Sequence, residues 1–365
     1  MSPSTDHLPD SPTSPAPAPP PTIPGIELGV IVGRGGNATV YAGRQIDHDR
    51  RVAVKVLDAP LDETARRRFD RERRALGRVA DHPNVVGLLG SGVSDGGRAH
   101  LVLEWAPGGS LADVLASGAT LSIDDATSLG IEMAGALEHA HRARIVHLDI
   151  TPANIMRSTY GEWLLGDFGV AAFTDARKRT ETLRVTFAHC APESFGDRHP
   201  DVGADIYSLA SVIRSAVTGT EANAVRPGET LTAAMARVAH TPMPPIPSGI
   251  VPDDLTDVLD RAMSMRPEHR PATMRSFAHQ LAALLRAHGL APVPFVVGTD
   301  VTITACSTDA GEAHTSPAPS TTTLRRRTRS RRTGRHRRRQ SGLRRAGAAM
   351  AMAMASVVAL VAGWG

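Results

Sequence analysis

The feature of this sequence that most constrains its fold is a polar loop, His147 to Asn154, followed by an Asp-Phe-Gly motif at positions 167–169. Carboxylate and amide oxygens are the ligands that Mg²⁺ prefers, and Asp149, Asn154 and Asp167 all carry such oxygens. Asp149 and Asn154 can serve one site only if the loop between them is tightly constrained. We therefore expect the three side chains to meet at one site, with Asn154 and Asp167 as the metal ligands.

A glycine-rich turn spans Gly33 to Val40, between two predicted strands at Ile26–Val32 and Thr39–Tyr41. Glycines let the backbone come close to phosphate oxygens and donate N–H groups to them. Alone, such a hairpin is more often just a tight turn. No helix pattern opens directly after it, which argues against a dinucleotide-binding fold, where the motif begins a helix.

Lys55 lies on the next predicted strand, Val52–Leu57, and is one of only two lysines in the chain. A strand lysine opposite the glycine turn can bring its ammonium group to bound phosphates. Glu72 lies seventeen residues further on, inside a predicted helix at Thr64–Val79, and is the candidate carboxylate to hold it. Taken singly, a surface lysine and an exposed helix carboxylate are equally reasonable interpretations.

Strand patterns come first along the chain and helix patterns follow, which is typical of an α+β fold with two lobes. Further predicted strands are Val86–Leu89 and His100–Glu104, and further predicted helices are Ser122–Ala143, Ala204–Val217, Leu231–Ala239, Asp254–Met263 and Thr273–His288.

Both ends of the chain differ in composition from its middle. Residues 1–25 are rich in proline, which removes backbone donors and stops helices, so we expect a disordered tail. Residues 26–288 form the predicted domain, and residues 289–323 read as a linker containing Pro, Ser and Thr.

An arginine-rich segment follows at residues 324–345, with twelve arginines and no acid. Because the whole chain carries a formal charge of +4, removing these twelve charges leaves −8 for the rest. Residues 346–365 carry no charge and would span ~30 Å as a helix, the thickness of a bilayer's hydrocarbon core. We predict a transmembrane helix with the arginines on the cytoplasmic side, the alternative being a buried helix.

Four more motifs are Leu103-Glu-Trp-Ala106, Ala191-Pro-Glu193, Asp205-Ile-Tyr-Ser-Leu209 and the arginine at 270 within Arg266–Pro271. Together with the polar loop, the glycine turn and the strand lysine, these motifs make the chain resemble a eukaryotic-type (Hanks-type) protein kinase. More narrowly, it is similar to the bacterial receptor-like, membrane-anchored serine/threonine kinases. The resemblance covers residues 26–288 and implies a bilobal fold, with a small β-rich lobe and a large helical lobe.

The resemblance also implies roles for residues. Lys55 would anchor the ATP phosphates and Glu72 would hold Lys55, while Asp149 would orient the accepting hydroxyl. Magnesium, or manganese in its place, would be bound by Asn154 and Asp167. The nucleotide site would comprise Val32, Gly33, Gly35, Gly36, Val40, Ala53, the gatekeeper Leu103, and the hinge residues Glu104 and Ala106. Thr186 matches the family's threonine before the Ala-Pro-Glu motif.

Three departures from the family pattern affect these expectations. Leu148 replaces the arginine that reads a phosphate on the activation loop, so phosphorylation of Thr180 or Thr182 is not the expected main switch. Thr151 replaces a lysine that neutralises the transferring phosphoryl group, which could cost ~2–4 kcal/mol of barrier and predicts a slow enzyme. His189-Cys190 replaces an aromatic and an apolar residue near the substrate.

The expected function is therefore transfer of the ATP γ-phosphoryl group to Ser/Thr hydroxyls of proteins, including this chain itself, at the cell membrane with the kinase domain cytoplasmic. The alternative is a nucleotide-binding pseudokinase acting as a membrane-tethered scaffold, although the five key residues are all retained. The arginine-rich segment could bind nucleic acid, but the uncharged helix that follows it favours anionic lipids. Homodimers through the small lobe occur in the resembling family.

Overall fold

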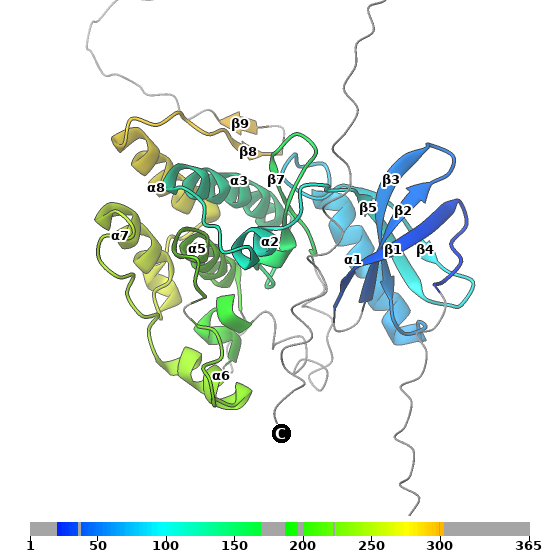
Figure 1. Ribbon diagram of the computed structural model, residues 1–365, viewed down its shortest axis with the longest axis horizontal. Coiled ribbons are helices and arrows are strands. Elements are labelled where there is room, and N and C mark those ends of the chain that lie inside the picture. The colour runs from blue at the N-terminus through cyan, green and yellow to red at the C-terminus, as the bar shows by residue number, and fades with distance from the viewer. Residues whose placement is uncertain are drawn as a thin grey trace, which may run out of the picture. The chain divides into compact units, whose positions relative to one another are not determined.

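The computed structural model describes residues 20–35, 38–168, 187–195, 200–221, 223–298 and 300–302. The chain divides into two units, Met1–Ser307 and Thr308–Gly365. The second unit lies wholly outside the described residues, so the fold below is that of the first (Figure 1).

The first lobe is built on an antiparallel five-stranded sheet of order β1-β2-β3-β5-β4. Its strands are β1 (Ile26–Arg34), β2 (Ala38–Gln45), β3 (Arg50–Leu57), β4 (Leu88–Val93) and β5 (Ala99–Glu104). Successive side chains of a strand point to opposite faces. The valines at 52, 54 and 56 therefore pack in one small core with Tyr41 and Val102, and Ala53 and Lys55 lie on the other face.

Helix α1 (Glu63–Val79) lies against this sheet (Figure 1). Phe69, Leu76 and Val79 form its buried stripe, which joins the core that continues into the second lobe. The spacing of these residues is that of one helix face.

The second lobe is helical, and its centre is α5 (Val202–Thr218), which is buried along almost its whole length. Asp201 caps its start and Gly219 ends it with φ of +69°, a conformation that glycine adopts without strain. Around it lie α2 (Leu111–Ala116), α3 (Ile123–Arg142), α6 (Leu231–His240), α7 (Asp253–Ala262) and α8 (Met274–Ala287).

Two short hairpins complete the described fold. Strands β6 (Ile155–Arg157) and β7 (Trp163–Leu165) follow the polar loop and lead directly into Asp167. Strands β8 (Phe295–Val297) and β9 (Asp300–Thr302) follow α8.

The predicted strands and helices are present, with ends that differ by a few residues. The largest difference is β4, which was predicted at Val86–Leu89 but begins at Leu88 and runs to Val93. The sequence patterns missed α2, which has only six residues, and the three-residue strands β6 to β9. Elements this short carry too few apolar positions to show a period.

Packed residues lie beyond two of the predicted domain boundaries. Ile23, within the predicted tail at 1–25, is only 4% exposed and packs in the small core of the sheet. Phe295 and Val297, within the predicted linker at 289–323, are each 2% exposed. The prolines around both segments concealed these apolar anchors.

Within the described part of the chain, no helix is both long and apolar enough to cross a membrane. The predicted arginine-rich segment at 324–345 and transmembrane helix at 346–365 lie outside the described residues.

Candidate active site

Lys55 and Asp167 meet although they are 112 residues apart in the chain. The Nζ of Lys55 donates to Oδ1 of Asp167 at 2.6 Å. Strand β3 fixes the lysine, with Lys55 opposite Val40 of β2 and Leu101 of β5. Asp167 follows β7 with φ of +59°. The contact therefore joins the five-stranded sheet of the first lobe to the segment that follows β7.

Asp149 and Asn154 are held against each other within the polar loop. The Nδ2 of Asn154 donates to the backbone oxygen of Asp149 at 2.8 Å and to its Oδ2 at 3.0 Å. A 3₁₀ turn at Pro152–Asn154 closes the loop, and the Asn154 N–H donates to the Thr151 oxygen at 3.0 Å. This is the constrained loop that the spacing of the two residues predicts.

His147 joins the polar loop to the segment before Asp167. Its Nδ1 accepts the Asp149 N–H at 3.3 Å, so its Nε2 carries the hydrogen and donates to the Gly166 oxygen at 2.9 Å. Its ring also meets Phe168 edge to face, with centroids 4.6 Å apart. Sequence reasoning used His147 only as a marker of the motif, and the structure gives it this bridging contact.

Asp205 anchors the polar loop to the core helix α5. It is fully buried, and its two carboxylate oxygens accept the backbone N–H groups of His147 and Leu148, each at 2.8 Å. Leu148 has φ of +60°, an unfavourable conformation for a residue with a side chain, and these bonds help to hold it. The Nε2 of His141, on α3, also lies 2.8 Å from the Asp205 carboxylate. Sequence reasoning missed His141, because a histidine at the end of a helix carries no signal of its own.

The two acids of the site have opposite pKa shifts. Burial raises the pKa of Asp149, and the nearby Asp167 carboxylate raises it further. The charges of His147 and Lys55 and the hydrogen bond from Asn154 act to lower this pKa, but their effect is smaller. Burial also acts to raise the pKa of Asp167, but the charge and hydrogen bond of Lys55 outweigh it, so this pKa is lowered. Asp167 is therefore the carboxylate more firmly held in its charged form.

The glycine turn closes the end of β1 and β2. Gly33 pairs with Val40, and the Gly35 N–H donates to the Ala38 oxygen at 2.8 Å. Gly36 lies outside the described residues. Val32, on β1, is half-buried.

The predicted adenine-side residues line the same part of the sheet. Ala53 pairs with Leu103, and Leu103 lines a cavity together with Lys55, Met156 and Asp167. The predicted gatekeeper thus lies beside the predicted phosphate anchor. Glu104 is the last residue of β5 and is exposed, and Ala106, just after the strand, is half-buried.

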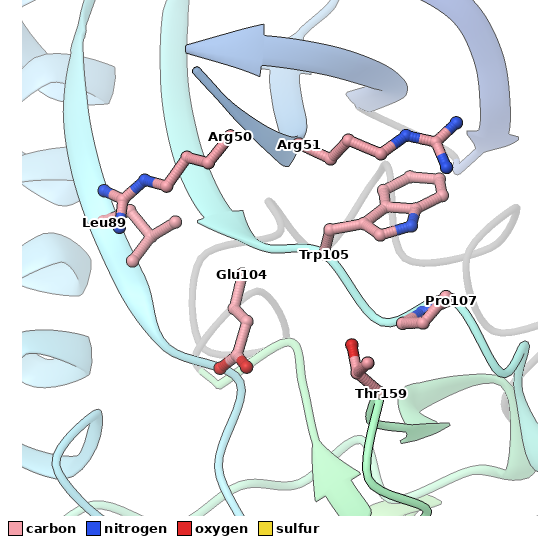
Figure 2. A pocket seen from close by; sticks show the side chains of 7 residues that line it. All are labelled: Arg50, Arg51, Leu89, Glu104, Trp105, Pro107 and Thr159. Carbon is pink, nitrogen blue, oxygen red and sulfur yellow. The ribbon is translucent and has the colours of Figure 1, made fainter. Parts of the chain in front are cut away.

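A second, open pocket lies beside the end of β5 and the residues that connect it to the helical lobe, and it has a volume of about 580 Å³ (Figure 2). Its lining residues are Arg50, Arg51, Leu89, Glu104, Trp105, Pro107 and Thr159. Figure 2 shows Arg51 alongside the indole of Trp105, and the guanidinium carbon lies 5.3 Å from the ring centroid.

Some predicted residues are beyond what the structure describes. The backbone of Glu72 lies in α1, but its side chain is not among those described, so its pairing with Lys55 stays a prediction. Gly169, Thr180, Thr182 and Thr186 lie outside the described residues.

Glu193 and Arg270 form a buried ion pair below the site. Two guanidinium nitrogens of Arg270 donate to the two oxygens of Glu193 at 2.6 and 2.9 Å. Arg270 also donates to the oxygens of Gly203 and Ser264 and lies over the Tyr207 ring. Such bidentate pairs are among the strongest side-chain contacts, and this one ties the Ala-Pro-Glu motif to α5.

The residues predicted to bind metal suit magnesium by their chemistry. Lys55 takes one oxygen of Asp167, and Asn154 uses its amide nitrogen toward Asp149. This leaves the Asn154 amide oxygen and a carboxylate oxygen of Asp167 as hard oxygen donors in the same site, which fits Mg²⁺.

Comparison with known proteins agrees with this geometry. Residues 26–282 match the sequence profile of the protein kinase domain. Over 274 residues the chain is 36% identical to the serine/threonine-protein kinase PknK of Mycobacterium tuberculosis, covering 74% of this chain and 25% of that protein. It is also 35% identical to PknJ of Mycobacterium bovis, over 72% of this chain and 45% of that protein. With PknB of Mycobacterium leprae the identity is 32%, over 73% and 43% of the two chains.

The chain thus spans less than half the length of these relatives. The match nevertheless covers the sheet, the polar loop and α5, which carry the contacts described above. The chain belongs to the protein kinase family, within its bacterial serine/threonine branch of eukaryotic type.

Proposed function

We propose that this chain is an active protein kinase that transfers the γ-phosphoryl group of ATP to serine or threonine hydroxyls of proteins. The observation that carries the proposal is that two bonded pairs, Lys55 with Asp167 and Asn154 with Asp149, lie close enough for the two carboxylates to affect each other's charge. Relatives named as serine/threonine kinases support the choice of acceptor.

In this proposal each residue has a distinct task. Lys55, held on β3 and neutralised by Asp167, presents its ammonium to the α and β phosphates. Asp149 accepts the hydrogen bond of the substrate hydroxyl and orients its oxygen for in-line attack, and Asn154 fixes the rotamer of that aspartate. When bound, Mg²⁺ would neutralise charge on the phosphates, held by Asn154 and Asp167.

His147 and Asp205 keep this arrangement in place without touching the reacting atoms. Asp205 holds two successive N–H groups of the loop, and His147 ties the loop to the residue before Asp167. Positioning of this kind supplies much of the rate of phosphoryl transfer, because the reaction needs little covalent help from the protein.

The test is radiolabel transfer from γ-labelled ATP by the full chain, to itself and to a basic acceptor protein, with mapping of the labelled residues. Asp149→Asn should reduce transfer by about a hundredfold or more, while nucleotide binding is kept. The matched control is Asp95→Asn, which changes an exposed acid in the turn after β4 and should leave the rate unchanged.

Two results would count against an active kinase. Nucleotide binding with no transfer by the wild-type chain would favour the pseudokinase scaffold, which the replacements at Leu148 and Thr151 motivate. Labelling of tyrosine alone would contradict the proposed acceptor class.

We further propose that the kinase domain acts on the cytoplasmic side of the cell membrane, anchored by residues 346–365 and by lipid contacts of the arginine-rich segment. The order of twelve arginines and then twenty uncharged residues supports this. After cell fractionation, the full chain should stay with membranes in high salt and be released by detergent. Release by salt alone would contradict a membrane span, and release by nuclease would favour nucleic acid.

Self-association through the small lobe is a separate proposal that rests on the family resemblance. Sedimentation of the purified chain over a range of concentrations tests it. A constant monomer mass throughout would contradict it.

A further inference from the structure

A segment that lies beyond the matched family region folds back onto the domain. We call residues Leu290–Gly298, which include β8, the strap. The family match ends at residue 282, but β8 lies along α3 (Figure 1), and its Phe295 contacts side chains of α8. Phe295 and Val297 are each 2% exposed and belong to the main hydrophobic core.

Side chains of α8 enclose the aromatic anchor of the strap. The Arg275 guanidinium carbon lies 5.1 Å from the Phe295 ring centroid, and the His279 ring meets it edge to face with centroids 6.3 Å apart. Cations and ring edges both pack favourably on an aromatic ring. The domain surface therefore offers a site shaped for this residue.

Helix α3 carries a glycine where the backbone of the strap crosses it. A Cβ atom at Gly135 would lie 2.6 Å from the Val296 oxygen, which is too close without a shift of the backbone. Glycine weakens the interior of a helix relative to alanine. Glycine at position 135 therefore lowers the helix propensity of α3, but it allows the backbone of the strap to lie close to the helix.

The strap also reaches the loop between α1 and β4. There, Nδ1 of His82 accepts the Asn84 N–H at 3.1 Å, so Nε2 carries the hydrogen and donates to the Val296 oxygen at 2.9 Å. Burial lowers the pKa of His82, in agreement with the neutral ring that both bonds require.

The same loop is bonded to the strand that leads to Asp167. The Val86 N–H donates to the Leu165 oxygen and the Leu165 N–H donates to the Asn84 oxygen, both at 2.9 Å. The Asn84 amide adds a bond to the Trp163 oxygen at 3.0 Å. A short path of contacts therefore runs from the strap through His82 and Asn84 to β7, two residues before Asp167.

We propose that the strap is a positioning element that holds the α1–β4 loop against β7, so that the phosphate-binding end of the site depends on a segment outside the matched kinase domain. The activity part of this inference rests on the proposed function. Release of the strap would loosen the α1–β4 loop and misplace Asp167.

The test compares full-length variants by amide hydrogen exchange and by steady-state kinetics. Gly135→Ala pushes on the strap without altering its sequence, and Phe295→Ala removes its anchor. Pro292→Ala, at an exposed strap position, is the matched control. The first two variants should speed exchange at residues 82–86 and 163–167 about tenfold and raise the KM for ATP more than they lower kcat.

His82 supplies a second, independent pair of variants in case the others fold poorly. His82→Ala should reproduce the faster exchange, whereas His82→Gln, whose amide can still donate to the Val296 oxygen, should restore much of the protection. Exchange that rises only in the strap, with residues 82–86 and 163–167 unchanged, would overturn the proposal. Because exchange does not require turnover, this outcome is distinct from failure of the proposed kinase activity.

Discussion

At the scale of single residues, the polar loop has the acid Asp149 but has a threonine, Thr151, where the resembling family has a lysine. Thr151 is 5% exposed and begins the 3₁₀ turn that carries Asn154. No positive charge comes from this position, where the resembling family places a lysine. The loop keeps the geometry of its acids and lacks one preorganised charge for the phosphoryl group.

We expect Thr151→Lys to raise kcat by about thirtyfold or more, because one preorganised charge contact is worth ~2–4 kcal/mol in such sites. The KM for ATP should change little. Steady-state kinetics beside Thr151→Met, which adds length without charge, separates charge from packing. Equal rates for both variants would show that charge at this position does not limit turnover.

Arg214 of α5 is a buried charge whose removal, we predict, does not destabilise the protein. It is 5% exposed, and its Nε and Nη1 have no hydrogen-bond partner among the described residues, while Nη2 donates to the Pro245 oxygen at 3.4 Å. Burial lowers the pKa of this arginine, and only the charge of nearby Asp260 and of Tyr207 opposes that shift. A buried cation with so few bonds contributes little to stability.

Arg214→Met should therefore leave the free energy of unfolding unchanged or raise it by about 1 kcal/mol. Urea denaturation measures this. Arg214→Ala is the companion variant and should destabilise the protein, since it leaves a cavity. A clear loss of stability in the methionine variant would mean that the charge itself is needed.

Sequence reasoning expected Asp149, Asn154 and Asp167 to lie at one site, but it did not identify the residues that hold them there. Asp149 and Asn154 lie five residues apart in one constrained loop, and Asp167 follows thirteen residues later, so their spacing is visible in the sequence. The support from His141 is invisible there, because it depends on how α3 packs beside α5. The predicted pairing of Glu72 with Lys55 would likewise depend on how α1 packs against the sheet.

At the scale of elements, α5 is the platform on which the polar loop stands. Its N-terminal turn carries Asp205, whose carboxylate accepts two loop N–H groups and faces His141. The same turn offers the Gly203 oxygen to Arg270, which holds Glu193. One helix end thus positions both the loop and the Ala-Pro-Glu motif.

We expect Asp205→Ala to lower the free energy of unfolding by about 3 kcal/mol or more, because it leaves two buried N–H donors without an acceptor. Activity should fall with it. Urea denaturation and transfer assays measure both effects. Asp201→Ala removes only the helix cap of α5 and should cost about 1 kcal/mol with activity kept. Equal losses in both variants would contradict a special role for Asp205.

Helices and strands were predicted correctly where an apolar pattern repeats over many residues or where a glycine turn is present. Short elements were missed. Helices such as α3 and α8 have enough turns to show their apolar stripe. In the strap, three apolar residues at 295–297 follow two prolines, a pattern that also suits a linker. Its contacts in the structure, with Phe295 buried against α8 and Val296 close to Gly135 of α3, show that the segment is bound.

At the scale of the whole molecule, the stable domain is wider than the family match at both ends. Ile23 packs with Tyr41 and the β3 valines before residue 26, and the strap packs on α3 and α8 after residue 282. The charge is divided just as unevenly, because twelve arginines in residues 324–345 outweigh a net acidic remainder.

A fragment of residues 26–288 should therefore be less stable than one of residues 20–303 by about 4 kcal/mol or more. The shorter piece loses burial of Ile23, Phe295 and Val297, and each such side chain contributes about 1.5–3 kcal/mol. Denaturant midpoints of the two fragments measure the difference. Equal midpoints would show that these segments rest on the domain without stabilising it.

The contact between Arg51 and Trp105 has a spectroscopic consequence. Trp105 directly follows Glu104 in the segment that connects the two lobes, and its indole lies beneath a guanidinium group. Trp163, the other tryptophan in the described residues, is 4% exposed and lies beneath Arg157 in the β6–β7 hairpin. A nucleotide bound beside Glu104 should therefore change the fluorescence of Trp105 more than that of Trp163, which gives the chain a built-in optical reporter of occupancy.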